Sequence, residues 1–208
     1  MTENRFDRAA GNWDQETRRI ELADAIATGI ARLPLHTGMQ AMEYGCGTGL
    51  VGLKLAPRLG SLVAADSSAG MLEVLRNKIG EQGITNVSPH LLDLHQDDFN
   101  REFDLIFSAM TLHHLENVQA VLAKLCTCLK PGGILALADL DEEDGSFHKD
   151  NPEGVMHHGF NRQKLARDLE MLGLIAIETT TVHTIRRPDS HGSERLFTVF
   201  LMTAVKKP

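Results

Sequence analysis

The segment Glu43-Tyr-Gly-Cys-Gly-Thr-Gly49 constrains the fold of this chain most strongly, because it places three glycines directly after a short apolar run. Residues 39–44 have the composition of a buried strand, and residues 50–59 have the pattern of a helix. Glycines at such a turn let a ligand approach the backbone closely, and a following helix offers free N–H groups to an anion. The segment therefore predicts a ligand-binding turn between a strand and a helix.

Strand-like and helix-like segments alternate along the chain. Strands are expected at 39–44, 61–66, 87–92, 103–108 and 134–140, and helices at 20–33, 50–59, 69–79, 118–129 and 161–172. Ser67 and Asn161 are predicted to cap the helices that follow them. Such alternation is typical of an α/β fold with a mainly parallel sheet and helices on both faces. The last two strands, 174–185 and 195–205, have no helix between them, which predicts an antiparallel hairpin at the sheet edge.

Composition limits the classes of function. The 208 residues fit one globular domain, and a formal net charge of -7 with only short basic runs disfavours a nucleic-acid partner. Three cysteines lack the spacing of a disulfide framework. No stretch approaches the ~20 apolar residues of a membrane helix, and no apolar signal core opens the chain. These features predict a cytoplasmic protein without a membrane partner.

The glycine segment resembles the first motif of the class I (Rossmann-like) S-adenosylmethionine-dependent methyltransferases, which carry an acid two residues before the first glycine. Asp66 ends the second strand and Asp93 the third, in register with that family. Residues 103–108 resemble its fourth-strand motif, and residues 129–133 resemble the turn before its fifth strand. The segment 47–52 also fits the GxGxxG dinucleotide pattern, but the remaining chain shows no second nucleotide-binding half. The resemblance covers residues 39–205.

The resemblance implies a Rossmann-like seven-stranded sheet, with an antiparallel C-terminal edge strand, that binds S-adenosylmethionine as cofactor. Glycine-loop N–H groups would take the donor's carboxylate. Asp66 would bind the ribose hydroxyls and Asp93 the adenine amine, while Ser67 borders the ribose and Met71 or Leu94 packs against adenine. Alternatively, Glu43 orients the loop and Met71 belongs to the core. The expected cofactor-binding residues are Glu43, Gly45, Cys46, Gly47, Asp66, Ser67, Met71, Asp93, Leu94 and Ser108.

The sequence indicates the binding site of the methyl acceptor less clearly than that of the methyl donor. His113, after the fourth strand, is the candidate catalytic base or substrate ligand, because histidine titrates near neutral pH; alternatively it caps or packs the helix start. His114 is expected near the substrate, or as a structural residue. Phe147 is expected to line an acceptor pocket, with loop histidines around it. Asp139 and Asp141 are interpreted as residues that form surface or loop hydrogen bonds, and no metal site is predicted.

The amino-terminal segment resembles the lid of small-molecule methyltransferases, with Trp13 either closing over the ligands or packing a helix on the sheet. We expect residues 1–36 to form this lid, and residues 37–208 to form the donor-binding domain. The predicted function is methyl transfer to a small organic acceptor. Protein- or RNA-directed methylation and a non-catalytic cofactor-binding module remain alternatives, and the oligomeric state, monomer or homodimer, stays open.

Overall fold

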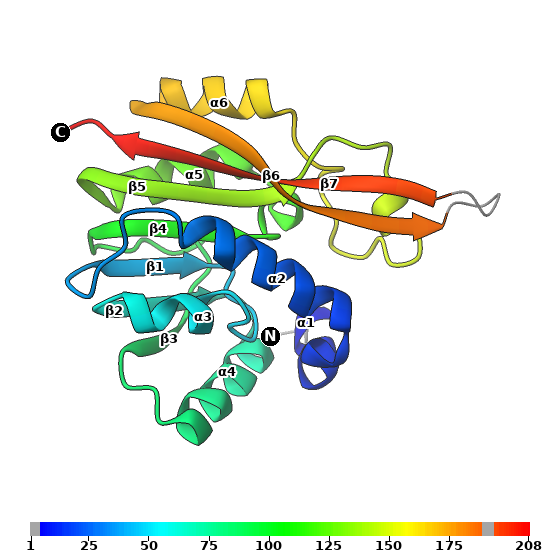
Figure 1. The fold of residues 1–208 in the computed structure, drawn as a ribbon, viewed down its shortest axis with the longest axis horizontal. Coiled ribbons are helices and arrows are strands. Elements are labelled where there is room, and N and C mark those ends of the chain that lie inside the picture. The colour runs from blue at the N-terminus through cyan, green and yellow to red at the C-terminus, as the bar shows by residue number, and fades with distance from the viewer. Residues whose placement is uncertain (1–4, 189–193) are drawn as a thin grey trace.

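A seven-stranded sheet forms the centre of the computed structural model, which describes residues 5–188 and 194–208 (Figure 1). The strand order is β3-β2-β1-β4-β5-β7-β6. Strands β1 to β5 pair in parallel, and β7 pairs antiparallel with both β5 and β6. The strands are β1 (Gln40–Tyr44), β2 (Ser61–Asp66), β3 (Val87–Leu91), β4 (Phe103–Ala109), β5 (Leu129–Leu140), β6 (Leu174–Pro188) and β7 (Glu194–Lys206).

This arrangement confirms the expected fold class. The structure adds that the antiparallel strand β7 inserts between β5 and β6, so β6 forms the outer edge of the sheet. Of the helices within the two described ranges, none is long and apolar enough to span a membrane. The helical segments are α1 (Arg5–Ala9), η1 (Ala10–Gln15), α2 (Thr17–Ile30), α3 (Gly52–Leu55), η2 (Ala56–Arg58), α4 (Ala69–Gln82), η3 (Leu112–His114), α5 (Val118–Thr127), η4 (Ser146–His148) and α6 (Arg162–Met171).

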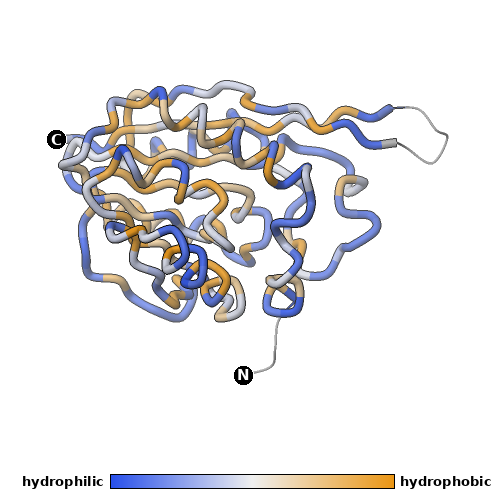
Figure 2. The backbone as a smooth tube through the Cα atoms, turned by 60° about the horizontal axis from the view of Figure 1, so that its bottom comes forward, coloured by the Kyte–Doolittle hydropathy of each residue, from blue (hydrophilic) through white to orange (hydrophobic). Residues whose placement is uncertain are grey.

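Two hydrophobic cores lie on opposite faces of the sheet. Helices α2, α3 and α4 bury residues in one core, and α5 and α6 bury residues in the other. Successive residues of β1 alternate between them, since Ala41 belongs to the first core and Met42 to the second. Figure 2 shows the hydrophobic colours concentrated in the strands, with hydrophilic loops outside. The sheet is therefore covered on both faces, which leaves its carboxyl edge to carry a site.

Several element boundaries differ from the expectation. Ser68, not Ser67, caps α4, because its side chain accepts the Met71 N–H at 3.2 Å. The single helix expected at 50–59 is divided into α3 and η2, since Pro57 lacks the N–H that would continue the helix. Helix α2 begins and ends three residues earlier than its apolar spacing indicated. Asn161 caps α6 as predicted, by accepting the Lys164 N–H.

Candidate active site

A cleft of about 230 Å³ lies at the carboxyl ends of β1 and β2, beside the turn that follows β4. We call it the glycine-loop cleft. Seven of the expected cofactor-binding residues line it, together with Trp13 and His114 from the expected lid and substrate set. The seven are Glu43, Gly45, Cys46, Gly47, Asp66, Ser67 and Met71.

The glycine loop requires glycine for two different reasons. Gly45 has φ +73°, and a Cβ there would lie 2.2 Å from the Thr111 hydroxyl oxygen, so only glycine permits this approach of β1 to the turn after β4. Gly47 has φ +53°, and a Cβ there would meet no atom within 4 Å. The open space at Gly47 is room for a ligand against the backbone.

Three N–H groups of the loop are already bonded within the chain and are not free for a ligand carboxylate. Gly45 N and Cys46 N donate to the Ala65 carbonyl at 2.8 and 3.0 Å. Gly47 N donates to the Asp66 carboxylate at 2.7 Å. The loop is thereby held to the end of β2 before any ligand binds.

Two acidic residues lie beneath this loop. Asp66 accepts from Gly47 N and, at 2.8 Å, from Ser68 N, and burial raises the pKa of its carboxyl. Glu43 is 2% exposed, and burial raises its pKa well above the usual range, with the Asp66 charge adding to the effect. The Glu43 Oε2 atom is buried without a hydrogen-bond partner. This oxygen lies against Gly52 at the start of α3, so Glu43 supports the loop from beneath.

Three expected cofactor residues lie outside the lining of this cleft. The Asp93 carboxylate closes a turn, accepting from His95 N and from the Gln96 side-chain amide, each at 2.9 Å. Leu94 is 1% exposed and belongs to the core. Ser108 is fully buried, and its hydroxyl donates to the Tyr44 carbonyl at 2.8 Å, which joins β4 to β1.

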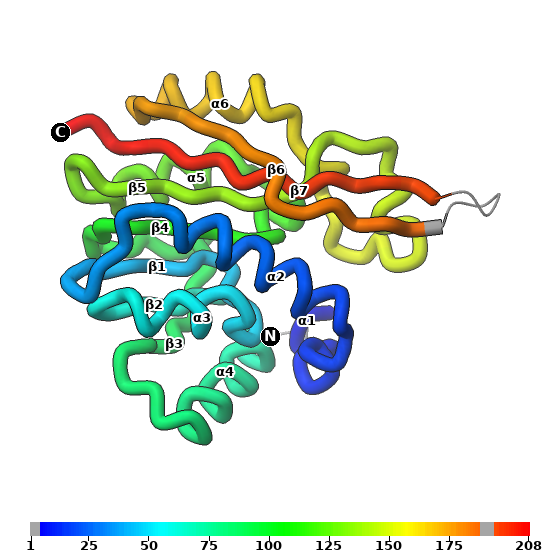
Figure 3. The backbone as a smooth tube through the Cα atoms, viewed as in Figure 1, coloured from blue at the N-terminus to red at the C-terminus, as the bar shows by residue number. Residues whose placement is uncertain are grey.

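The amino-terminal segment crosses the carboxyl side of the sheet, where α1 lies beyond the end of β1 (Figure 3). The Asp14 carboxylate accepts from the Thr48 hydroxyl of the glycine loop at 2.6 Å and pairs with Lys78 at 2.6 Å. The Arg19 guanidinium lies 3.7 Å from the centroid of the Trp13 ring, which lines the cleft. The segment is therefore fastened directly over the glycine loop.

A second cavity of about 700 Å³ adjoins the first, and we call it the histidine cavity. It is lined by His113, His148 and Phe147, together with residues of α2, β6 and β7. The two spaces share the lining residues Trp13, Arg19, Leu22, Met110 and His114. Met110 has a φ of +55°, an uncommon conformation for a non-glycine residue, at this junction.

His113 and Asp139 form a buried pair at the histidine cavity. The His113 Nδ1 atom lies 2.7 Å from Asp139 Oδ1, and the His113 backbone N–H donates to Asp139 Oδ2 at 3.3 Å. The two residues are 1% and 0% exposed. An ionised carboxylate only accepts hydrogen bonds, so it holds the proton on Nδ1 and leaves Nε2 as an acceptor. This geometry is that of an oriented histidine base.

Asp139 was interpreted from sequence as a surface or loop residue, and the structure corrects this. Asp139 is an acid within the apolar run 134–140, and this run was expected to form a strand next to the one that precedes His113. That position was the signal that could have identified the buried role of Asp139. Asp141 instead forms a two-point ion pair with Arg162, with both contacts at 2.6 Å. No group of three or more His, Cys, Asp or Glu side chains in residues 5–188 and 194–208 is arranged to hold a metal ion.

His114 and Phe147 take different places around these cavities. His114 Nδ1 lies 2.7 Å from the Gly154 carbonyl, and burial, with the neighbouring His113, lowers the pKa of its ring to about 2. It is therefore neutral at physiological pH. Phe147 is 5% exposed and packs edge-on against His148, with ring centroids 4.7 Å apart.

A model of the methyltransferase domain family matches residues 41–133. An uncharacterized methyltransferase of Schizosaccharomyces pombe is 32% identical over 161 residues, which are 71% of this chain and 56% of that protein. The methyltransferase GfsG of Streptomyces halstedii is 30% identical over 185 residues, 83% of this chain and 66% of that protein. The chain thus spans about half to two thirds of the length of these relatives.

Solved structures show the same fold. A phosphoethanolamine N-methyltransferase of Haemonchus contortus, in complex with S-adenosyl-L-methionine, superposes with a TM-score of 0.72 at 16% identity over 89% of this chain and 52% of that one. The YcgJ protein of Bacillus subtilis gives a TM-score of 0.74 at 15% identity, over 89% of this chain and 99% of that one. With the glycine loop, its two acids and the sheet order, these matches show that the chain belongs to the class I S-adenosylmethionine-dependent methyltransferase family.

Proposed function

We propose that this protein transfers a methyl group from S-adenosylmethionine to a small organic acceptor. The observation that carries the proposal is the junction of two cavities, in which the glycine-loop cleft meets the histidine cavity at Met110 and His114. A donor in the first space and an acceptor in the second would meet beside His113. The curated relatives carry varied names, from a trans-aconitate 2-methyltransferase to a ubiquinone biosynthesis O-methyltransferase, and so favour no single acceptor.

The residues of the glycine-loop cleft suit the proposed donor. The Asp66 carboxylate would accept the ribose hydroxyls, with Ser67 beside them and Met71 against the adenine. The Glu43 carboxyl would act on the donor's ammonium through the loop. The donor's carboxylate would lie near Arg19, which lines the same cleft and also pairs with Glu16. We assign Asp93, Leu94 and Ser108 to the support of this cleft.

The chain's own groups act on the acceptor. When bound, S-adenosylmethionine supplies a methyl group on a positively charged sulfur, so positioning accounts for much of the catalysis. An acceptor hydroxyl or amine that must lose a proton would give it to His113 Nε2, while Asp139 stabilises the charge that forms on the ring. Residues 1–36 would act as the lid that excludes water, and residues 37–208 as the donor-binding domain.

Calorimetric titration with S-adenosylmethionine tests the donor site. Replacing Asp66 by alanine removes a charged hydrogen-bond acceptor, and we expect affinity to fall at least about tenfold. Asp98→Ala is the matched control, because Asp98 is 82% exposed in a surface pair with Lys124. Wild-type affinity in Asp66→Ala would remove Asp66 from the site.

A second measurement tests turnover. The folded wild-type protein, incubated with methyl-labelled donor and fractionated metabolites, should form S-adenosylhomocysteine together with a labelled product. No donor binding by the wild-type protein near saturating concentrations would overturn the proposal.

A further inference from the structure

The residues that line the histidine cavity are mainly basic, whereas the chain as a whole is acidic. Among its described lining residues six are basic and two acidic, whereas the whole chain has 21 basic and 28 acidic residues. A recess lined mainly by one sign of charge attracts ligands of the opposite sign. The basic residues are Arg5, Arg18, Arg19, Lys149, Arg187 and Arg195, and the acidic ones are Glu16 and Asp150.

Most of these arginines are already engaged. Arg18 and Arg19 pair with Glu16, at 3.2 and 2.8 Å, and Arg195 pairs with Asp144 at 2.7 Å. Arg5 donates to the backbone carbonyls of the loop before Gly154.

Arg187 of β6 differs from these arginines in its contacts. Its Nη1 donates to the Phe147 carbonyl, and its guanidinium lies 4.0 Å from the centroid of the Phe147 ring. No carboxylate of the described residues lies within ion-pair distance of it. The nearest acids, Asp150, Glu16 and Glu143, act on it only at longer range. Among the residues that the structure describes, Arg187 is therefore a half-buried cation without a direct counter-ion.

Unpartnered polar atoms gather on the same wall. Five buried side-chain atoms lack a hydrogen-bond partner in the part of the chain that the structure describes, and three of them belong to residues that line this cavity. These three are Ser146 Oγ, His148 Nε2 and Arg187 Nε. An unpaired buried polar group destabilises the folded protein, so three on one wall favour a polar ligand there.

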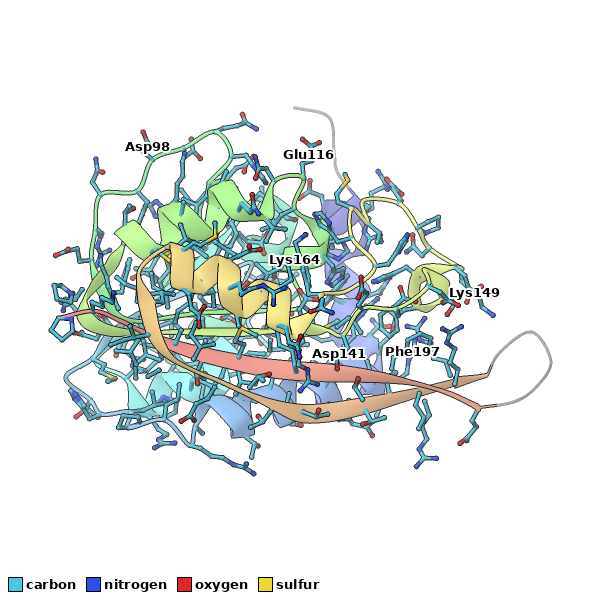
Figure 4. The ribbon with its side chains drawn as sticks, turned by 90° about the horizontal axis from the view of Figure 1, so that it is seen from above. Asp98, Glu116, Asp141, Lys149, Lys164 and Phe197 are labelled. Atoms are coloured by element: carbon cyan, nitrogen blue, oxygen red, sulfur yellow. The ribbon has the colours of Figure 1, made fainter. Side chains whose placement is uncertain are left out.

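These groups lie next to the proposed reaction centre. The rings of His113 and His148 are stacked with centroids 5.1 Å apart, and His148 contacts Phe147, over which Arg187 lies. Figure 4 shows two further lining residues, Lys149 and Phe197, at the end of the molecule near the β6–β7 hairpin. One continuous wall therefore runs from His113 to Arg187.

The charge state of His148 determines the charge of a matching ligand. Burial, together with the nearby His113, lowers the pKa of His148 to about 4, so the ring is neutral at physiological pH. A neutral ring can donate one N–H, a serine hydroxyl can donate another, and a guanidinium donates two in parallel. The wall thus offers several donors and one positive charge that no carboxylate of residues 5–188 and 194–208 pairs with, which matches a carboxylate ligand.

We propose that the methyl acceptor is a carboxylic acid whose carboxylate binds Arg187, Ser146 and His148 while its nucleophilic atom faces His113. Its carbon skeleton lies against the apolar side chains of Phe147, Ile185 and Phe197. This inference rests on the proposed function, because it assigns the acceptor's class in the same site.

Benzoate is a suitable probe, because it combines a carboxylate with a small apolar body. We expect benzoate to bind the wild-type protein and to raise the pKa of His148, followed by NMR of the histidine rings, because a bound anion stabilises the protonated ring. Neutral benzamide should not bind. Arg187→Gln should weaken benzoate at least about tenfold, the loss of one charged hydrogen-bonding group. Arg186→Gln is the matched control, since Arg186 precedes Arg187 in β6, pairs with Glu194 on the surface and does not line the cavity, so its benzoate affinity should stay within about twofold.

Two results would overturn the inference. Equal affinity for benzoate and benzamide would exclude recognition of the charge, and unchanged benzoate affinity in Arg187→Gln would exclude Arg187. Phenyl phosphate binding more tightly than benzoate would replace the carboxylate by a phosphate ester. Calorimetry with S-adenosylhomocysteine on the same samples separates this inference from the proposed function. Donor binding without benzoate binding refutes only the acceptor class, whereas loss of donor binding refutes the methyltransferase proposal.

Discussion

The orientation of the His113 ring depends on its contacts with Asp139. The Asp139 carboxylate is fully buried, and it is satisfied by His113 and by the Leu140 N–H at 2.7 Å. A buried charge is tolerated only when it is hydrogen-bonded in this way. The arrangement aligns the His113 ring and favours one tautomer.

If His113 is the base that we propose, its removal should reduce turnover and spare donor binding. We expect His113→Ala to lower kcat by about 10²–10⁴-fold, the usual contribution of a general base, with little change in the Kd for S-adenosylhomocysteine. Added imidazole should restore part of the activity, which a purely structural role would not allow. Asp139→Asn should give a smaller loss of kcat in the same assay. Unchanged turnover in His113→Ala would return His113 to a structural role.

His114 predicts a pH dependence of stability. Its pKa is lowered from 6.5 to about 2 in the folded protein by burial, so the unfolded chain binds a proton that the folded chain does not. The stability it contributes is therefore fully present above pH 6.5 and is lost as the pH falls toward 2. The slope of the unfolding free energy should be about 1.4 kcal/mol per pH unit for this residue.

The measurement is denaturant unfolding between pH 4 and 8. His114→Gln keeps a donor for the Gly154 carbonyl but cannot titrate, so its stability should depend less on pH than that of the wild type. Above pH 7 the two curves should run parallel, which serves as the internal control. Parallel curves over the whole range would show that His114 does not contribute this dependence.

At the scale of elements, α4 shows how local sequence begins and ends a helix. Ser68 caps its first turn, and Gly83 ends it in the left-handed conformation with φ +63°. The same Ser68 hydroxyl donates to Asp7 of the amino-terminal segment at 2.6 Å. Ser68 therefore both caps α4 and binds the amino-terminal segment.

Two glycines near the end of α4 should respond in opposite directions to the same substitution. Gly80 lies inside the helix with open space around its Cβ position, so Gly80→Ala should raise stability by about 0.5–1 kcal/mol. Gly83 also has open space but a positive φ, so Gly83→Ala should lower stability by about 1–2 kcal/mol. Urea denaturation of each variant tests the pair, and changes of equal sign would contradict the assigned helix end.

At the scale of the whole molecule, the amino-terminal segment joins parts that are distant in sequence. Asp14 reaches the glycine loop and α4, Asp7 reaches the start of α4, and Arg8 pairs with Glu153 of the loop after β5 at 2.8 Å. The amino-terminal segment thus contacts residues next to both the glycine-loop cleft and the histidine cavity.

Removing these contacts should loosen the proposed lid without unfolding the sheet. In Asp7→Ala/Asp14→Ala we expect amide hydrogens of residues 5–15 to exchange at least about tenfold faster, since charged hydrogen bonds are lost, while β1 keeps its protection. Donor dissociation should also accelerate. Asp98→Ala is the control, because it removes a surface pair with Lys124 outside residues 1–36. Unchanged exchange in residues 5–15 would show that these contacts do not hold the lid.

The sequence by itself determined the sheet, the glycine loop and the residues at the end of β2. These features depend on local properties, namely the spacing of apolar residues, the freedom of glycine and the position of an acid at a strand end. That is why Glu43, Gly47 and Asp66 were placed correctly around one cleft. Local rules were less reliable at helix boundaries, as the change from Ser67 to Ser68 shows.

Only the tertiary structure decided the partners of these residues. The pairing of His113 with Asp139 depends on the register of β4 against β5, and the position of Arg187 depends on β7 lying between β5 and β6. It also showed that three loop N–H groups are engaged and that Asp93 closes a turn of its own. Contacts between residues far apart in the chain arise from packing that no local pattern specifies, so Asp139 and Arg187 could not be assigned to the proposed acceptor site from the sequence.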